Sequence, residues 1–323
     1  MKFAVESWDP AYGSSTADPD MEASDAPVEA DHEVPASSWA PIDPGPADRG
    51  LVVTFVDGVR RVDSRVWIDD GQRSHLGLCA TVAAGSVTCV EGGAMLGPAQ
   101  IERGLYSAVP NAARVPLPNG GAYEPKAAAS DDDGSLFLAI HNHMTAVEEE
   151  VSAEAVGAVG PMDAAPPPRP SGLPHPDLLI LDGPLRGRET TEAVGYVKTH
   201  HVLYLDAKLQ RVVAELRPGQ RTPLFLIGGH FARWSWYMRL PGPVTHPYSG
   251  IARLELPFLG DADSAAGRAD TITAVLPRYA SEPHKDARAP QNLYPIAGLE
   301  RELRRRLGDA QLLERFLRRA AMV

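Results

Sequence analysis

Cysteine is nearly absent from this chain, with only Cys79 and Cys89 among 323 residues. So few cysteines exclude a disulfide framework and a zinc finger, and we expect both to be small apolar residues on neighbouring strands. The sequence also lacks a run of ~18–20 apolar residues, which a membrane span requires, and a secretory leader. We therefore expect a cytoplasmic protein that does not contact a membrane.

Basic residues are also in short supply, because 31 Lys and Arg face 42 Asp and Glu, a net charge of −11. An evenly spread negative charge would repel nucleic acid. The charge is uneven, however: residues 1–50 hold eleven acidic and two basic residues and so carry −9, which leaves −2 for residues 51–323. The acidity therefore does not exclude a nucleic-acid partner.

The composition divides the chain into an acidic, Pro-rich N-terminal arm (1–50) and a single domain (51–323) interrupted by a Pro-rich linker or insertion (161–176). The apolar run 51–57 predicts a buried strand. Gly58 predicts a turn into a second strand over 59–69. Strands over 76–82 and 86–90 are expected on either side of a turn at Ala84 and Gly85.

Further along, apolar runs predict strands and amphipathic spacing predicts helices. The strands are expected at 177–183, within 190–205, and at 223–229, 234–240 and 251–257, and the helices at 136–159, 206–216, 264–280 and 296–321. This order predicts an α/β fold with a mixed central sheet flanked by helices.

Two aspartates stand out, because Asp57 and Asp182 each end an apolar strand and precede glycine. A carboxylate there is poorly solvated and is stabilised by a cation. If the two strands are neighbours, their carboxylates suit Mg²⁺ or Mn²⁺. The alternative is that each pair forms an ordinary Asp-Gly turn.

The order of these motifs resembles the NurA nuclease family. VTFVDGVRRVDSR (53–65) resembles its first motif and LLILDGPLRG (178–187) its second. VGYVKTH (194–200), WSWYMRLPG (234–242) and NLYPIAGLERELRRRLGD (292–309) resemble later ones. The resemblance implies an RNase H-like fold and a metal-dependent deoxyribonuclease, an exo- or endonuclease that processes DNA ends. Its implied partners are DNA, a HerA-type hexameric ATPase and a second copy of the chain.

The resemblance also implies roles for individual residues. Asp57 and Asp182 would be the principal ligands of two Mg²⁺ or Mn²⁺ ions. One further acidic ligand would come from the helix expected at 136–159, before Asp182. Among Glu148, Glu149 and Glu150 we favour Glu149, although only one or two of the three can face the sheet.

Outside the ligand set, the resemblance assigns two further residues. Tyr237 would position phosphate or water, unless it is a core aromatic residue. Lys198 would neutralise a phosphate, unless it is only solvent-exposed.

The last motif departs from the family, which has a histidine ligand where this chain has Glu300. Glutamate is a competent ligand for a hard metal, but it also suits the first turn of a helix. His200, His201 and His230 are possible replacements. The missing histidine raises an alternative function, a scaffold subunit with weakened catalysis. An α/β hydrolase of small molecules is disfavoured because the chain lacks a nucleophile elbow and a P-loop.

Arginines close to the two aspartates favour a phosphodiester substrate, because phosphate contacts supply most non-specific affinity. The candidates for DNA contact are Arg60, Arg61, Arg186 and Arg188. We also hypothesise that the acidic arm covers basic surface and competes with DNA. This hypothesis predicts tighter DNA binding after deletion of residues 13–49.

Overall fold

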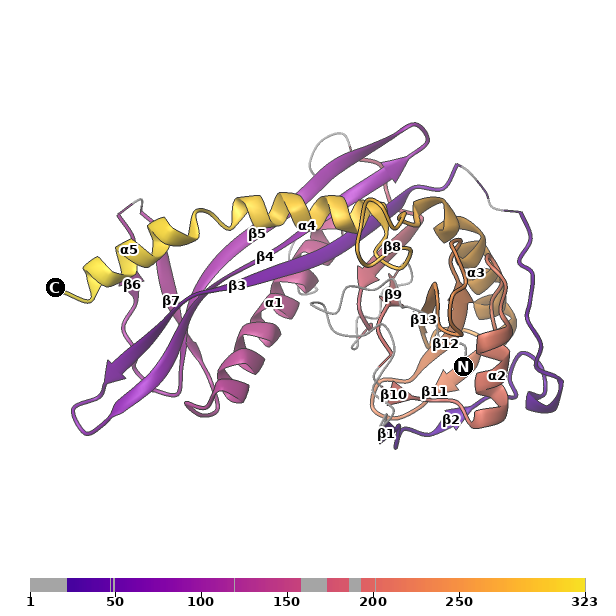
Figure 1. Ribbon diagram of the computed structural model, residues 1–323, viewed down its shortest axis with the longest axis horizontal. Coiled ribbons are helices and arrows are strands. Elements are labelled where there is room, and N and C mark those ends of the chain that lie inside the picture. Colours follow the sequence, from indigo (N-terminus) through magenta and orange to yellow (C-terminus); the bar gives the residue numbers. More distant parts are fainter. Residues whose placement is uncertain are drawn as a thin grey trace. The chain divides into compact units, whose positions relative to one another are not determined.

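The structure is a computed structural model (Figure 1) that describes residues 22–46, 48, 50–118, 120–157, 173–185, 193–200 and 202–322. The chain forms two compact units. The first comprises Met1–Phe55, Cys89–Ala94 and Pro176–Ala297, and the second comprises Val56–Thr88, Met95–His175 and Gly298–Val323. Both combine strands with helices, as expected of an α/β protein.

The first unit is built on strands in the order β2-β11-β12-β13-β9-β8. The bounds of its elements are β1 (Glu22–Ala23), β2 (Val28–Glu29), β8 (Leu178–Asp182), β9 (Ala193–Val197), β10 (Val202–Leu203), α2 (Ala207–Glu215), β11 (Phe225–Ile227), β12 (Arg233–Arg239), β13 (Ile251–Pro257) and α3 (Ala262–Val275), with short 3-10 helices at Ala36–Ser38 and Leu276–Tyr279. Strands β8 and β9 are parallel, whereas β13 pairs antiparallel with both β9 and β12. The sheet is therefore mixed.

The second unit is built on three long strands, β3, β4 and β5 (Figure 1). The bounds of its elements are β3 (Val53–Asp69), β4 (Ser74–Val90), β5 (Gly93–Ser107), β6 (Val115–Pro116), β7 (Ala122–Ala127), α1 (Asp133–Val156), α4 (Tyr294–Arg306) and α5 (Ala310–Ala320). Short ends of β3, β4, β5 and α4 belong to the first unit, namely residues 53–55, 89–90, 93–94 and 294–297. Side chains alternate between the two faces of a strand. On β5, Leu105 packs with α5 and the next residue, Tyr106, contacts His143 of α1. The helices α1 and α5 therefore cover opposite faces.

Two expected turns are absent, because β3 continues through Gly58 and β4 continues through Gly85. A Cβ at Gly58 would overlap a carboxylate oxygen of Glu148 on α1 and lie 3.0 Å from Met144 Cγ. A Cβ at Gly85 would lie 3.0 Å from a methyl carbon of Leu303 on α4. Both glycines make room for a helix that crosses the strand. From the sequence alone, such a glycine cannot be distinguished from a glycine in a turn.

The helix expected over 296–321 is two helices, α4 and α5. Gly308 has a φ of 85°, which favours glycine, and the Asp309 side chain accepts a hydrogen bond from the Leu312 backbone N–H at 2.9 Å. A left-handed glycine after one helix and an N-cap aspartate before the next form a helix stop and start. The periodic leucines continue across the break and so conceal it.

Part of the acidic arm is built into the first unit. Strand β2 pairs antiparallel with β11, and Trp39 packs in the core beside Phe225. Glu33 forms a bidentate ion pair with the buried Arg221, with N···O distances of 2.7 and 2.9 Å. Residues 28–39 are therefore part of the fold rather than a loose arm.

Two other sequence features bear on the chain as a whole. Most of the Pro-rich segment, residues 161–172, lies outside the described residues. Within the described ranges, none of the helices combines the length and the apolar character needed to cross a bilayer.

Candidate metal centre

Asp57 is a buried acid on β3, with 5% of its surface exposed. The residues before it, Val53 to Val56, are all buried, which is why the apolar run reads as a central strand. Asp57 accepts a hydrogen bond from the Gly58 backbone N–H at 2.8 Å. The alternative reading as an Asp-Gly turn does not hold here, since the strand runs on to Asp69.

Asp182 is the last residue of β8, and Gly183 turns the chain with a φ of 107°. Here the Asp-Gly turn and the candidate ligand occur together. Asp182 lies opposite Tyr196 in the parallel β8–β9 ladder. Lys198 follows two residues later, and its Nζ lies 2.7 Å from Asp182 Oδ2. Lys198 therefore forms an ion pair with this carboxylate.

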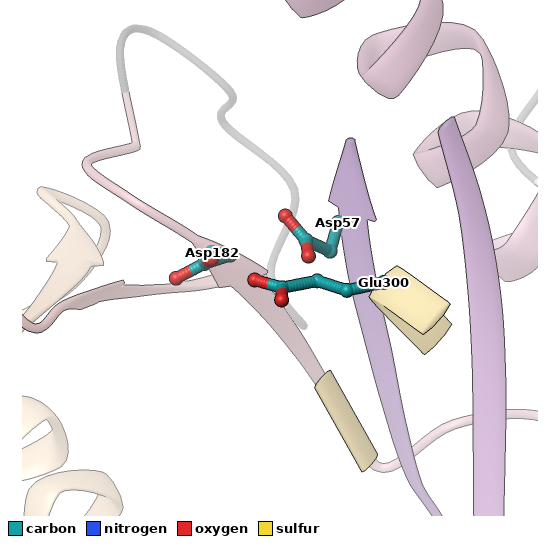
Figure 2. A group of neighbouring side chains, drawn as sticks. All are labelled: Asp57, Asp182 and Glu300. Carbon is teal, nitrogen blue, oxygen red and sulfur yellow. The ribbon is translucent and has the colours of Figure 1, made fainter. Parts of the chain in front are cut away.

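Glu300, on α4, completes a group of three carboxylates with Asp57 and Asp182. One oxygen from each lies within 4.8 Å of the others. Figure 2 shows the three side chains converging from β3, β8 and α4. Glu300 is 6% exposed, and Arg304 approaches it at 3.6 Å.

Three carboxylates so close repel one another, and a divalent cation between them offsets this repulsion. Oxygen ligands of this kind suit Mg²⁺ and Mn²⁺. The residues present therefore fit a divalent metal ion.

The helix glutamates differ from our expectation. Glu149, which we expected to face the sheet, is exposed, as is Glu150, whereas Glu148 is buried with 6% of its surface exposed. Helix positions one apart point about 100° apart, so the register could not be read from three consecutive glutamates. The Glu148 carboxylate lies over Gly58, and Gly58 follows Asp57 in the chain. Glu148 is nevertheless not part of the group formed by Asp57, Asp182 and Glu300.

Tyr237 lies in the core of the first unit. It is 2% exposed and stacks on Phe225 with ring centroids 5.8 Å apart, and burial raises its pKa to about 12. These contacts favour the core interpretation over a role with phosphate. His200 is also buried and contacts the Ile251 carbonyl oxygen at 3.1 Å, while His230 is exposed. His201 lies outside the described residues.

The four candidate arginines have different environments. Arg60 is exposed. Arg61 donates to the carbonyl oxygens of Leu307 and Gly308, at 3.3 and 2.8 Å, and so holds the end of α4. Arg186 and Arg188 lie outside the described residues.

A buried ion cluster supports the turn that follows Asp182. The Glu255 carboxylate accepts from Arg253 at 2.5 Å, from Arg233 at 2.8 Å and from the Leu185 backbone N–H at 2.9 Å. Burial by itself raises the pKa of Glu255, but the two arginines outweigh burial and lower the pKa below its ordinary value. An ionised Glu255 thus fixes the backbone three residues beyond Asp182.

Sequence reasoning missed Asn292, which is fully buried and accepts a hydrogen bond from Lys198 Nζ at 2.9 Å. It stands at the start of the last motif, directly before LYP. That position was the available signal, but an asparagine beside a turn is usually a turn residue.

A family model supports the resemblance seen in the motifs. Residues 174–305 match the family model described as the NurA domain, a segment that holds Asp182, Lys198 and Glu300. The solved structure of the NurA nuclease from Sulfolobus solfataricus is similar with a TM-score of 0.47 and 10% identity, over 82% of this chain and 81% of that one. No curated protein matches the chain.

Proposed function

We propose that this chain, with its NurA domain, is a metal-dependent deoxyribonuclease that hydrolyses phosphodiester bonds. The observation that carries the proposal is the group of three carboxylates, Asp57, Asp182 and Glu300. In this proposal the three residues hold one or two Mn²⁺ or Mg²⁺ ions. When bound, such ions activate water and stabilise the leaving 3′ oxygen.

The remaining residues of the site bind and orient the substrate in this proposal. Lys198 offsets the charge of Asp182 and approaches a phosphate oxygen, since it contacts that carboxylate at 2.7 Å and lines the same pocket. Glu255 holds the turn behind Asp182 so that the carboxylate keeps its orientation. Positioning and electrostatic stabilisation are the main contributions of a protein to such a reaction.

We propose further that the fold is RNase H-like and that the protein acts as a homodimer with a HerA-type hexameric ATPase on DNA ends. The family resemblance supports these partners. The near-neutral charge of residues 51–323 is compatible with a DNA substrate.

The test compares cleavage of single-stranded and duplex DNA with Mn²⁺ or Mg²⁺ by the wild type and by Asp57→Asn, Asp182→Asn and Glu300→Gln. We expect each variant to lose at least ~100-fold in rate, since changes even of residues that only support metal ligands cost about 10–100-fold. We expect EDTA to abolish cleavage. The matched controls are Asp69→Asn and Glu149→Gln, which alter exposed acids of the same types.

Metal binding itself, measured by calorimetry with Mn²⁺, should weaken in the three site variants and not in the controls. Cleavage that persists in both aspartate variants would exclude this site. A folded wild type that cleaves no DNA, alone or with a HerA-type ATPase, would instead favour the scaffold function.

A further inference from the structure

A pocket of about 280 Å³ adjoins Asp182 within the first unit. Its walls are the turn after β8, the end of β9 and one residue from a distant segment. The lining residues are Asp182, Gly183, Pro184, Tyr196, Val197, Lys198, Thr199 and Arg288. Two of its polar side chains, Lys198 and Arg288, are cationic, and sequence reasoning did not single out Arg288.

The ammonium group of Lys198 is fixed in this pocket. It contacts Asp182 at 2.7 Å and Asn292 Oδ1 at 2.9 Å, and its side chain is only 12% exposed. An ammonium group has three N–H donors. Within the part of the chain that the structure describes, Asp182 and Asn292 are the two groups that bind the Lys198 ammonium. The third N–H donor is therefore available to a ligand.

Arg288 is held by the same network. The Asn292 side-chain N–H donates to Asp286 Oδ2 at 2.8 Å, so that its oxygen faces Lys198. Asp286 in turn lies 3.7 Å from Arg288 Nε and accepts from the Arg288 backbone N–H at 2.8 Å. The Arg288 side chain is 12% exposed. One buried asparagine and one aspartate thus connect the two cations that line the pocket.

We infer that this pocket is a phosphate subsite for the nucleic-acid backbone, with Lys198 and Arg288 as its two cations. The inference rests on the proposed nuclease function. Arginine and lysine are the usual partners of phosphate oxygens, and a guanidinium group binds two of them at once. Since Asp182 lies in the same pocket, a phosphate seated there is next to the carboxylate group that holds the metal.

The test is the salt dependence of DNA binding in EDTA, where no cleavage occurs. Fluorescence anisotropy of a labelled 20-nucleotide strand and of its duplex is measured from about 50 to 300 mM KCl. Each phosphate contact contributes ~0.7 to the slope of log K against log salt for a single strand and ~0.9 for a duplex. We expect Arg288→Gln and Lys198→Gln each to lower the slope by about one contact, and Arg288→Lys to retain it.

The matched control is Arg211→Gln, an exposed arginine of the same unit that does not line the pocket. Its slope should equal that of the wild type. As a measurement that needs no variant, phenylglyoxal modification of Arg288 in the wild type, located by mass spectrometry, should fall at least 3-fold when the strand is bound.

Two results distinguish the inference from the function on which it rests. If the wild type binds and cleaves DNA but Arg288→Gln keeps its slope and Arg288 gains no protection, the phosphate subsite is wrong and the nuclease stands. If the wild type binds no DNA, both are wrong.

Discussion

At the scale of single residues, the site depends on charged side chains that are at least partly buried and form ion pairs with one another. Lys198 accompanies Asp182, and Arg233 and Arg253 accompany Glu255. A charge that is removed from water is tolerated only when partners replace its hydration. Each such residue is therefore sensitive to the loss of its partner.

Glu255 gives a prediction for the dependence of stability on pH. Its folded pKa is lowered, so its contribution is fully present above the unfolded pKa of about 4.3 and is lost as the pH falls through the lower folded value. We expect Glu255→Gln to lose ~3–5 kcal/mol at pH 7 because the buried Arg253 and the partly buried Arg233 lose their partner. Between about pH 5 and pH 3 its stability should fall less than that of the wild type.

Urea unfolding at pH 7, 5, 4 and 3 measures this effect, with the exposed Glu215→Gln as the control. Parallel pH curves for the wild type and Glu255→Gln would contradict the assigned role of the carboxylate.

At the scale of elements, the second unit depends on helices that cross long strands closely. Gly58 admits Glu148 of α1, and Gly85 admits Leu299 and Leu303 of α4. A strand interior usually disfavours glycine because of its entropy. The close approach of a helix explains why glycine occupies these two positions.

These contacts predict the effect of added methyl groups. Gly58→Ala and Gly85→Ala should each destabilise the protein by ~1–3 kcal/mol, the usual cost of overpacking. The control is Gly93→Ala on β5, where a Cβ would meet nothing within 4 Å, and we expect it to change stability by no more than ~0.5 kcal/mol. Chemical denaturation measures all three, and an equal effect at the three positions would argue against the helix contacts.

At the scale of the whole molecule, the acidic N-terminal arm has two parts. Residues 28–39 supply a strand, a core tryptophan and the buried partner of Arg221. The hypothesis of an arm that competes with DNA concerns residues 13–49, and a deletion of that range also removes these contacts. A change in DNA binding after this deletion would therefore have two possible causes, the loss of a competing acidic segment and the loss of the folded contacts of residues 28–39.

A shorter deletion separates them. Removing residues 2–21 leaves β2, Glu33 and Trp39 in place, so their contacts with β11, Arg221 and Phe225 are kept. Removing 13–49 should cost several kcal/mol, because Arg221 is left buried without Glu33. Denaturation measures both deletions. Tighter DNA binding by the shorter deletion would support competition by residues 13–21, because the folded contacts of 28–39 are kept.

The sequence alone identified what local pattern determines. Apolar runs ended by acids located Asp57 and Asp182, strand β13 was predicted over its observed range, and the motif order pointed to the NurA domain. These features are visible because burial on both faces of a strand requires a continuous apolar run.

Only the tertiary structure decided which distant residues meet. It brought Glu300 to the two aspartates, turned Glu148 rather than Glu149 inward and placed Arg288 beside Lys198. It also showed that Gly58 and Gly85 accommodate helices, while Gly183 has a positive φ of 107° at the end of β8. The local sequence around a glycine does not show whether it lies in a turn or under a crossing helix, and that around a glutamate does not show whether it is buried or exposed. The difference depends on a partner many residues away in the chain. That partner is set by the packing of whole elements, which local pattern does not encode.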